Sequence, residues 1–140
     1  MSLPIPTTHL DLLTESIHGV LTTMMPDGQP QSSLVWCDFD GECVRINTSL
    51  ERQKGRNLTR NPKATLLVVD PQDTSRYIEI RGEVQLVREG ALEHLDEITR
   101  CYTAHSRYYG YVFPIEKKAK ERRVICRLHA KKITLDAIHK

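Results

Sequence analysis

No apolar run in the 140-residue sequence approaches the ~20 residues that a membrane-spanning helix needs. The four cysteines form no C-x-x-C pair, and no histidine stands at zinc-finger spacing from two of them. The net charge is only +2, which argues against a chain that binds a polyanion over its whole surface. These absences predict a cytoplasmic protein with free thiols, no metal site and no membrane partner, and they require any anion site to be local.

The stretch "MSLPIPTTHLDLL" lacks the basic segment and the unbroken apolar core of a secretory signal, so we expect none. The composition is that of an ordinary globular protein, with 39% hydrophobic and 27% charged residues. The length suits one domain over residues 1–140, with enough chain to bury a core. Strand-like runs alternate with turns and a few helices, without a strict β–α order. This pattern predicts a mainly β fold, an antiparallel barrel of six or so strands with short helices.

A strong turn signal, Asp40-Gly41, lies between the apolar-rich runs 31–39 and 42–48. A two-residue turn here would pair residue 39 with residue 42. One face of the hairpin would then be apolar and would carry Val35, Cys37, Phe39, Val44 and Ile46. The other face would set Trp36, the only tryptophan, opposite Arg45. We expect this mixed face to meet a partner subunit or a flat ligand.

Periodicity predicts several other elements. The run "RYIEIRGEVQLV" alternates as a strand whose inward residues are Ile78, Ile80, Val84 and Leu86. The run "EGALEHLDEITRCYTAH" has helical spacing along Leu92, Leu95, Ile98 and Tyr102. The runs "RVICRL" and "KITLDAI" are expected to be the last two strands. Near the N-terminus, Thr7-Thr8 could cap a short helix that Gly19 closes.

The stretch "NTSLERQKGRNLTRNPKATLLVVD" places hydroxyls and cations between two strands. We expect a helix that begins near Lys54 and ends before Asn61-Pro62. Arg52 then lies in the preceding turn and can converge with Lys54 and the free N–H groups of the helix start. This arrangement would form a phosphate cradle without a glycine-rich loop. The alternative is an ordinary surface helix that Ser49 caps and the cations solvate, and this segment alone leaves both open.

The order of motifs along the chain carries a family resemblance. It comprises "DGxPQ" before the second strand, Arg-x-Lys-x-Arg-Asn-Leu, "NP" before the next strand, and "I-x-G-x-V" in the fifth. With these motifs, residues 19–88 and, loosely, the strand "ERRVICRL" resemble the pyridoxamine 5'-phosphate oxidase-like, flavin-binding split-barrel superfamily. Within it, the chain is most similar to small deazaflavin-dependent reductases.

This resemblance implies a six-stranded split β-barrel that forms a homodimer, with two cofactor sites at the subunit interface. Gln31 to Trp36, including Ser33, would run along the flavin or deazaflavin ring. Asn47 and Thr48 would contact the ring or the ribityl group, and Arg52 and Lys54 would hold the phosphate. Tyr77 of the other subunit would also contact the cofactor, and here the chain departs from related flavin enzymes, which often carry a glutamine at this place.

The resemblance also implies coenzyme F420 or FMN as the cofactor, and hydride transfer with an unsaturated small-molecule acceptor. FMN ends at its phosphate, whereas F420 continues into an acidic tail that a basic track would favour. Such a track could comprise Arg52, Lys54, Arg56, Arg60 and Lys63, so we favour F420, with FMN as the alternative. Helical spacing also explains Arg56 and Arg60 as a solvated face. No catalytic residue is assigned; His105, Tyr109 or solvent could donate a proton, and "YYGYVF" could be a lid or part of the acceptor pocket.

Other functions remain possible from the residues alone. A non-catalytic flavin- or haem-binding module would, for haem, need an axial ligand such as His9, His18, His94 or His139. The basic run "EKKAKERR" could contact nucleic acid, but its glutamates would repel phosphate, so a solvated face is the expectation. Oxidation of vitamin B6 is disfavoured, because the Arg-x-His pair of Arg127 and His129 falls in the middle of a predicted strand.

Overall fold

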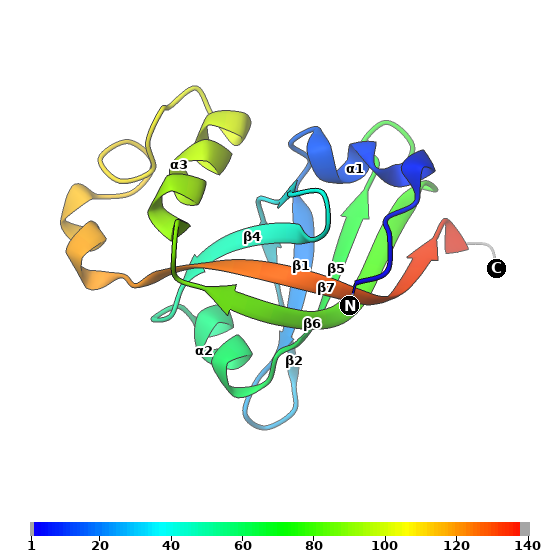
Figure 1. Ribbon diagram of the computed structural model, residues 1–140, viewed down its shortest axis with the longest axis horizontal. Coiled ribbons are helices and arrows are strands. Elements are labelled where there is room, and N and C mark those ends of the chain that lie inside the picture. The colour runs from blue at the N-terminus through cyan, green and yellow to red at the C-terminus, as the bar shows by residue number, and fades with distance from the viewer. Residues whose placement is uncertain (1, 138–140) are drawn as a thin grey trace.

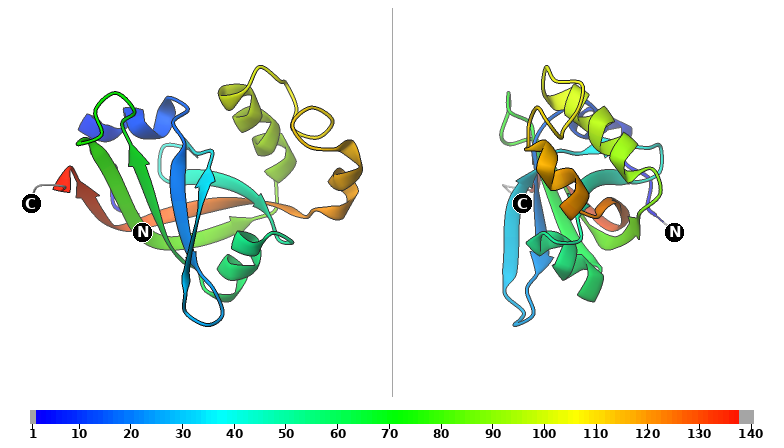
Figure 2. Two further views of the ribbon diagram at one scale, coloured as in Figure 1. Left: turned by 180° about the vertical axis from the view of Figure 1, so that it is seen from behind. Right: turned by 90° about the vertical axis from the view of Figure 1, so that its left-hand side faces the viewer.

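The computed structural model describes residues 2–137 and consists mainly of one curled antiparallel sheet (Figure 1). The sheet has seven strands in the order β2-β1-β5-β6-β7-β4-β3, and it curls into a half-barrel (Figure 2). The strands are β1 (Gly19–Met24), β2 (Pro30–Val35), β3 (Asp38–Phe39), β4 (Val44–Ser49), β5 (Lys63–Val69), β6 (Tyr77–Val87) and β7 (Arg123–Leu135). The predicted mainly β, antiparallel split-barrel fold is therefore confirmed, with seven strands where six were expected.

Two predicted strand boundaries differ from the structure. The run 31–39 is divided into β2, which pairs with β1, and β3, which pairs with β4. The last two predicted strands are one strand, β7, which pairs with β6 from Ile125 to Leu135, with a register shift between Arg81 and Gly82 of β6. One long strand replaces two because β6 supplies a continuous partner for it.

The register of the β3–β4 hairpin was predicted wrongly. Phe39 pairs with Val44 and Asp38 pairs with Arg45, so the turn is longer than two residues. The Asp40 carboxylate accepts hydrogen bonds from the backbone N–H groups of Glu42 (2.9 Å) and Cys43 (2.7 Å), which stabilises the longer turn. The shift is two residues, and side chains alternate with a period of two, so the predicted apolar face is preserved.

The core lies on the concave side of the sheet, and it includes the inward residues predicted for β6. Ile78, Ile80 and Val84 are buried there, and Leu86 packs against them. At the N-terminus the structure has a 3₁₀ turn, η1 (Thr7–His9), and one helical turn, α1 (Asp11–Thr14). The predicted helix up to Gly19 is thus too long, because Ser16 adopts a positive φ of 58° and ends it.

Two helices flank the half-barrel on either side of the end of β4 (Figure 1). Helix α2 (Gln53–Arg60) begins and ends as predicted. Helix α3 (Ala91–Tyr102) buries Ala91, His94, Leu95, Ile98 and Thr99. Leu92 is 41% exposed and not inward-facing as predicted, since the buried stripe is centred on Ala91 and His94. A 3₁₀ segment, η2 (Ile115–Lys120), connects the loop after α3 to β7. No helix within residues 2–137 is long and apolar enough to cross a membrane.

Candidate cofactor site

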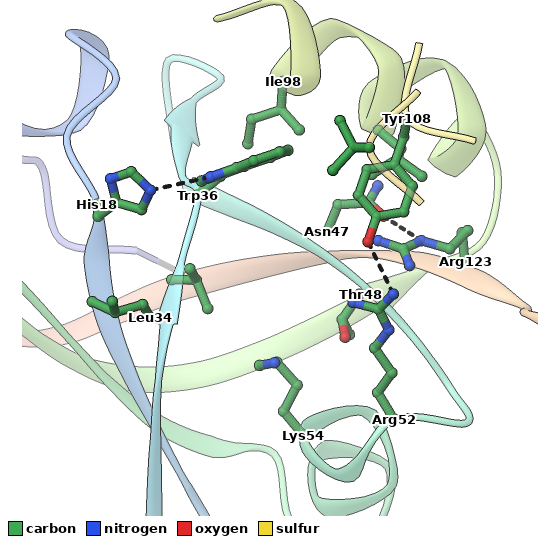
Figure 3. Close-up of a pocket in the computed structure, with 13 residues that line it drawn as sticks. His18, Leu34, Trp36, Asn47, Thr48, Arg52, Lys54, Ile98, Tyr108 and Arg123 are labelled. Carbon is green, nitrogen blue, oxygen red and sulfur yellow. Dashed lines mark hydrogen bonds between the residues drawn. The ribbon is translucent and has the colours of Figure 1, made fainter. Parts of the chain in front are cut away.

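A cavity of about 350 Å³ lies between α3, the end of β2, β4 and the start of α2 (Figure 3). One end is polar and cationic, with Asn47, Thr48, Arg52, Lys54 and Arg123. The other end is mostly apolar, with His18, Leu34, Val35, Trp36, Leu95, Ile98, Tyr108 and Val112. An elongated ligand with an anionic end and a planar end fits this division.

The start of α2 has the geometry that the sequence predicted. Arg52 is the extended residue before the helix, with φ −77° and ψ 157°, and Lys54 lies in the first turn. Both side chains line the cavity. Ser49 does not cap α2; its buried hydroxyl instead donates a hydrogen bond to Glu121 (3.3 Å). The predicted capping of α2 by Ser49 is therefore wrong.

Two groups at the cationic end have unmet bonding capacity. The hydroxyl of Thr48 is buried without a hydrogen-bond partner, and among the described residues it is the single buried side-chain N or O atom in that state. The Lys54 ammonium is half-buried and forms no hydrogen bond or ion pair with any described residue. Burial lowers the pKa of Lys54, and the nearby charges of Arg52 and Arg123 lower it further. An anion that accepts hydrogen bonds would satisfy both groups, so a phosphate fits here.

Arg52 is not fully available to a ligand, because Glu121 already pairs with it. Its Nε donates to Glu121 (3.0 Å) and its Nη2 donates to the Tyr108 hydroxyl (3.0 Å). Glu121 also accepts from Tyr109 (2.6 Å) and Arg123 (3.3 Å). Burial would raise the pKa of Glu121, but these donors lower it below the ordinary value. Three cations against one carboxylate leave this end of the cavity positive.

Arg123 belongs to the site, although the sequence reasoning treated it as part of a solvated basic run. It is 4% exposed, and its Nε donates to the Asn47 side-chain oxygen (2.9 Å; Figure 3). The signal that could have found it is the alternation of "RVICRL", which puts Arg123 on the same face of β7 as Ile125. The preceding residue, Arg122, is by contrast exposed and pairs with Glu51.

The apolar end is organised around Trp36. The indole N–H donates to His18 (3.2 Å), and the ring stacks on Tyr102 with centroids 5.4 Å apart. Trp36 does not face Arg45 as predicted, because Arg45 forms two hydrogen bonds with Asp38 (2.9 and 2.8 Å). Helix α3 of the same chain contacts this part of the mixed face, where His94 lies next to Asp38. Of the mixed face, Leu34, Trp36 and Asn47 line the cavity, whereas Asp38 and Arg45 pair with each other next to α3. Contact of this face with a partner subunit stays a prediction.

The structure brings together five of the eight residues that the resemblance assigned to the cofactor: Trp36, Asn47, Thr48, Arg52 and Lys54. Gln31 and Ser33 lie on β2 outside the cavity lining, and Gln31 is 3.5 Å from the amide of Asn57. Tyr77, at the start of β6, accepts a hydrogen bond from the backbone of Ala137. The resemblance places Tyr77 in the site of a second subunit, so its role stays a prediction.

Several other predicted candidates are engaged elsewhere. His9 and His94 have both ring nitrogens in hydrogen bonds, and His139 lies outside the described residues. Arg127, of the Arg-x-His pair, contacts Asp40 and Glu42.

Of the predicted basic track, only Arg52 and Lys54 line the cavity. Arg56 donates to Glu51 and Gln53, Arg60 donates to the backbone of Met24, and neither lines the cavity. Within residues 2–137, no group of three or more His, Cys, Asp or Glu side chains could hold a metal ion.

Comparison with known proteins agrees with this fold. The sequence model of the pyridoxamine 5'-phosphate oxidase family matches residues 5–135, and the chain belongs to that family. A solved structure described as an F420 reductase is 30% identical, with a TM-score of 0.79 over 93% of this chain and 98% of that chain. A conserved hypothetical protein of Mycobacterium tuberculosis is 26% identical, with a TM-score of 0.71 over 96% of this chain and 85% of that chain.

A curated relative from Nostoc sp., a pyridoxine/pyridoxamine 5'-phosphate oxidase, is 33% identical over 75 residues. These residues are 53% of this chain but only 35% of that protein, so the match covers about a third of the relative. Together these findings confirm the suspected superfamily and the likeness to F420 reductases. They support a class of oxidoreductases related to flavins or deazaflavins.

Proposed function

We propose that this chain is an oxidoreductase that transfers a hydride between reduced coenzyme F420 and an unsaturated small-molecule acceptor, with FMN as the alternative cofactor. The proposal rests on two groups that line one cavity. The buried Thr48 hydroxyl has no hydrogen-bond partner, and the half-buried Lys54 ammonium has no ion-pair partner among the described residues. Leaving such groups unsatisfied costs stability, and a bound phosphate would recover that cost. The likeness to an F420 reductase over nearly the whole of both chains favours the deazaflavin.

The residues of the cavity have distinct roles in this proposal. Lys54, Thr48 and Arg123 hold the phosphate, and Arg52 contributes charge while Glu121 orients it. Leu34, Trp36 and Ile98 flank the planar ring and exclude water from it. When bound, either cofactor supplies the hydride chemistry, and the protein supplies binding and orientation. The described lining carries the cations Arg52, Lys54 and Arg123 and no Asp or Glu, which disfavours a cationic acceptor.

No side chain is assigned as the proton donor. Tyr109 does not line the cavity, and its hydroxyl donates to Glu121 (2.6 Å). Burial and this contact raise the pKa of Tyr109 to about 12, which keeps its proton in place. His105 is exposed after the end of α3 and lies against Tyr111. Solvent is therefore the proton source in this proposal.

The proposal includes a homodimer with the cofactor at its interface, as the resemblance implies. Leu34 at the mouth of the cavity is 71% exposed, and it lies on β2 at the edge of the sheet. A second chain against this edge would cover Leu34 and close the cavity. In that arrangement Gln31 and Ser33 of β2, and Tyr77 of the partner subunit, complete the proposed cofactor contacts.

The proposed function is tested by titrating both cofactors and following their fluorescence. We expect F420 to bind more tightly than FMN at low salt, because its acidic tail extends past the phosphate toward the exposed Arg56 and Arg60. The difference should shrink as salt rises, since exposed charges are screened within about 10 Å at 0.1 M. Tighter binding of FMN at every salt concentration would replace the deazaflavin with FMN. Binding of neither cofactor would contradict the proposed function.

The cradle itself is tested with Lys54→Ala and the matched control Arg60→Ala on the same helix. Charge-assisted hydrogen bonds contribute roughly 1.5–3 kcal/mol each, so Lys54→Ala should weaken the binding of either cofactor at least about tenfold. Arg60→Ala should weaken FMN binding much less, because Arg60 contacts the Met24 carbonyl outside the cavity. Equal losses in the two variants would indicate general electrostatic attraction and contradict a localised phosphate site.

A further inference from the structure

A chain of hydrogen bonds runs behind the cationic end of the cavity, from Asp38 through His94 and Asn47 to Arg123. His94 lies on α3, is 2% exposed and does not line the cavity. Its Nε2 is 3.2 Å from the Asp38 carboxylate, and its Nδ1 is 3.1 Å from the Asn47 amide nitrogen. The chain ends at the Asn47 oxygen, which accepts from Arg123 Nε (2.9 Å; Figure 3).

The chemistry of the two ends determines which atoms carry protons. Burial would raise the pKa of Asp38, but hydrogen bonds from His94 and Arg45 lower it, so Asp38 is a carboxylate that only accepts. His94 therefore carries its proton on Nε2, and its Nδ1 is an acceptor. A guanidinium can only donate, so the Asn47 oxygen faces Arg123 and the Asn47 NH₂ group faces Nδ1. That NH₂ group also donates to the Ala91 carbonyl (2.8 Å), and every hydrogen bond in the chain then has a donor and an acceptor.

We propose that His94 is a positioning residue for the anion-binding end of the cavity, acting through Asn47 on Arg123. Without an acceptor at the Nδ1 position, the Asn47 NH₂ group keeps only the Ala91 carbonyl as an acceptor, and the amide is held less firmly in this orientation. A rotated amide would point its NH₂ group at the Arg123 guanidinium, where two donors repel. Arg123 would then keep only Glu121 as a hydrogen-bond partner among the described residues and shift from its position next to Thr48 and Lys54. The ligand in this inference is the phosphate end of the proposed cofactor, so this part rests on the proposed function.

The test compares two conservative substitutions that keep different atoms of the imidazole. Asn at position 94 places an oxygen near the Nδ1 site, whereas Gln places its polar atoms near the Nε2 site and leaves Nδ1 without an acceptor. The probe is inorganic pyrophosphate, and its binding is followed by the fluorescence of Trp36, the only tryptophan, which lines the cavity. His94→Gln should weaken pyrophosphate binding about tenfold, and His94→Asn should remain within about threefold of the wild type. Glu93→Gln, on the exposed side of α3, is the control and should change nothing.

A second measurement uses the wild-type protein and therefore does not depend on whether a variant folds. Long-range ¹H–¹⁵N correlation spectra of the ligand-free protein should show a proton on Nε2 of His94 and none on Nδ1. A proton on Nδ1 would overturn the inference. Unchanged pyrophosphate binding in a folded His94→Gln variant would overturn it as well, and so would equal losses in the Gln and Asn variants, because a packing role would not distinguish them.

The outcomes separate this inference from the proposed function. If the wild type binds neither F420 nor FMN, while pyrophosphate binding follows the expected order of variants, the proposed function fails and the positioning role of His94 stands. If the wild type does not bind pyrophosphate either, both are overturned.

Discussion

Gly55→Ala should destabilise the protein by about 3 kcal/mol, although alanine is normally the better residue inside a helix by roughly 1 kcal/mol. The reason is the close approach of α2 to the end of β4. A Cβ atom at Gly55 would lie 2.0 Å from the carbonyl oxygen of Ser49 and 2.9 Å from its carbon. These are backbone atoms and cannot rotate away as a side chain could, so the helix or the strand has to move. Chemical denaturation with a linear extrapolation measures the change in the free energy of unfolding.

The same displacement should remove anion binding, because Arg52 and Lys54 are carried by the start of α2. Gly90→Ala is a suitable control. Gly90 has a φ of +76°, and a Cβ there would meet nothing within 4 Å, so only the conformational cost of about 1–2 kcal/mol applies. The control variant should keep its affinity for the cofactor. A Gly55→Ala protein with wild-type or higher stability would show that α2 does not approach β4 as described.

Arg123→Met should cost about 3 kcal/mol of stability and abolish measurable cofactor binding, whereas Arg122→Met should cost no more than about 1 kcal/mol. The two residues are adjacent in the sequence and chemically identical. Arg123 is buried, pairs with Glu121, and occupies the Asn47 side-chain oxygen. Removing the Arg123 side chain leaves the Asn47 oxygen without its donor. It also leaves the largely buried Glu121 carboxylate with one cationic partner fewer. The Arg122 side chain is 62% exposed, and its pair with Glu51 is screened by solvent.

Thermal or chemical unfolding of the two variants, together with a cofactor titration, provides the comparison. The matched design removes the change in net charge as an explanation, because both variants lose one positive charge. Similar stabilities and similar affinities in the two variants would contradict a specific role for Arg123. They would indicate that the basic run acts as one solvated surface.

The sequence by itself determined the local elements and the faces that they bury. The alternation in 76–87 predicted a strand with Ile78 and Ile80 in the core, and both are buried. Turn and helix signals located α2 to within a residue, with Arg52 just before it. The apolar face of the β3–β4 hairpin was predicted correctly even though the register was wrong. A shift of two residues leaves each side chain on its own face. These features depend on neighbours a few residues apart, which the sequence displays directly.

The tertiary structure alone decided which distant residues share the site. Glu121 meets Arg52 across 69 positions, Asn47 meets Arg123 across 76, and Asn47 meets His94 across 47. Periodicity can state that Arg123 and Ile125 share a face of β7, but not that this face lies beside Asn47. That contact depends on the pairing of β4 with β7 and on the packing of α3, which are set by the closure of the whole half-barrel. For this reason the sequence does not distinguish Arg122 from Arg123. Only the fold makes Arg122 a surface residue and Arg123 part of the cavity.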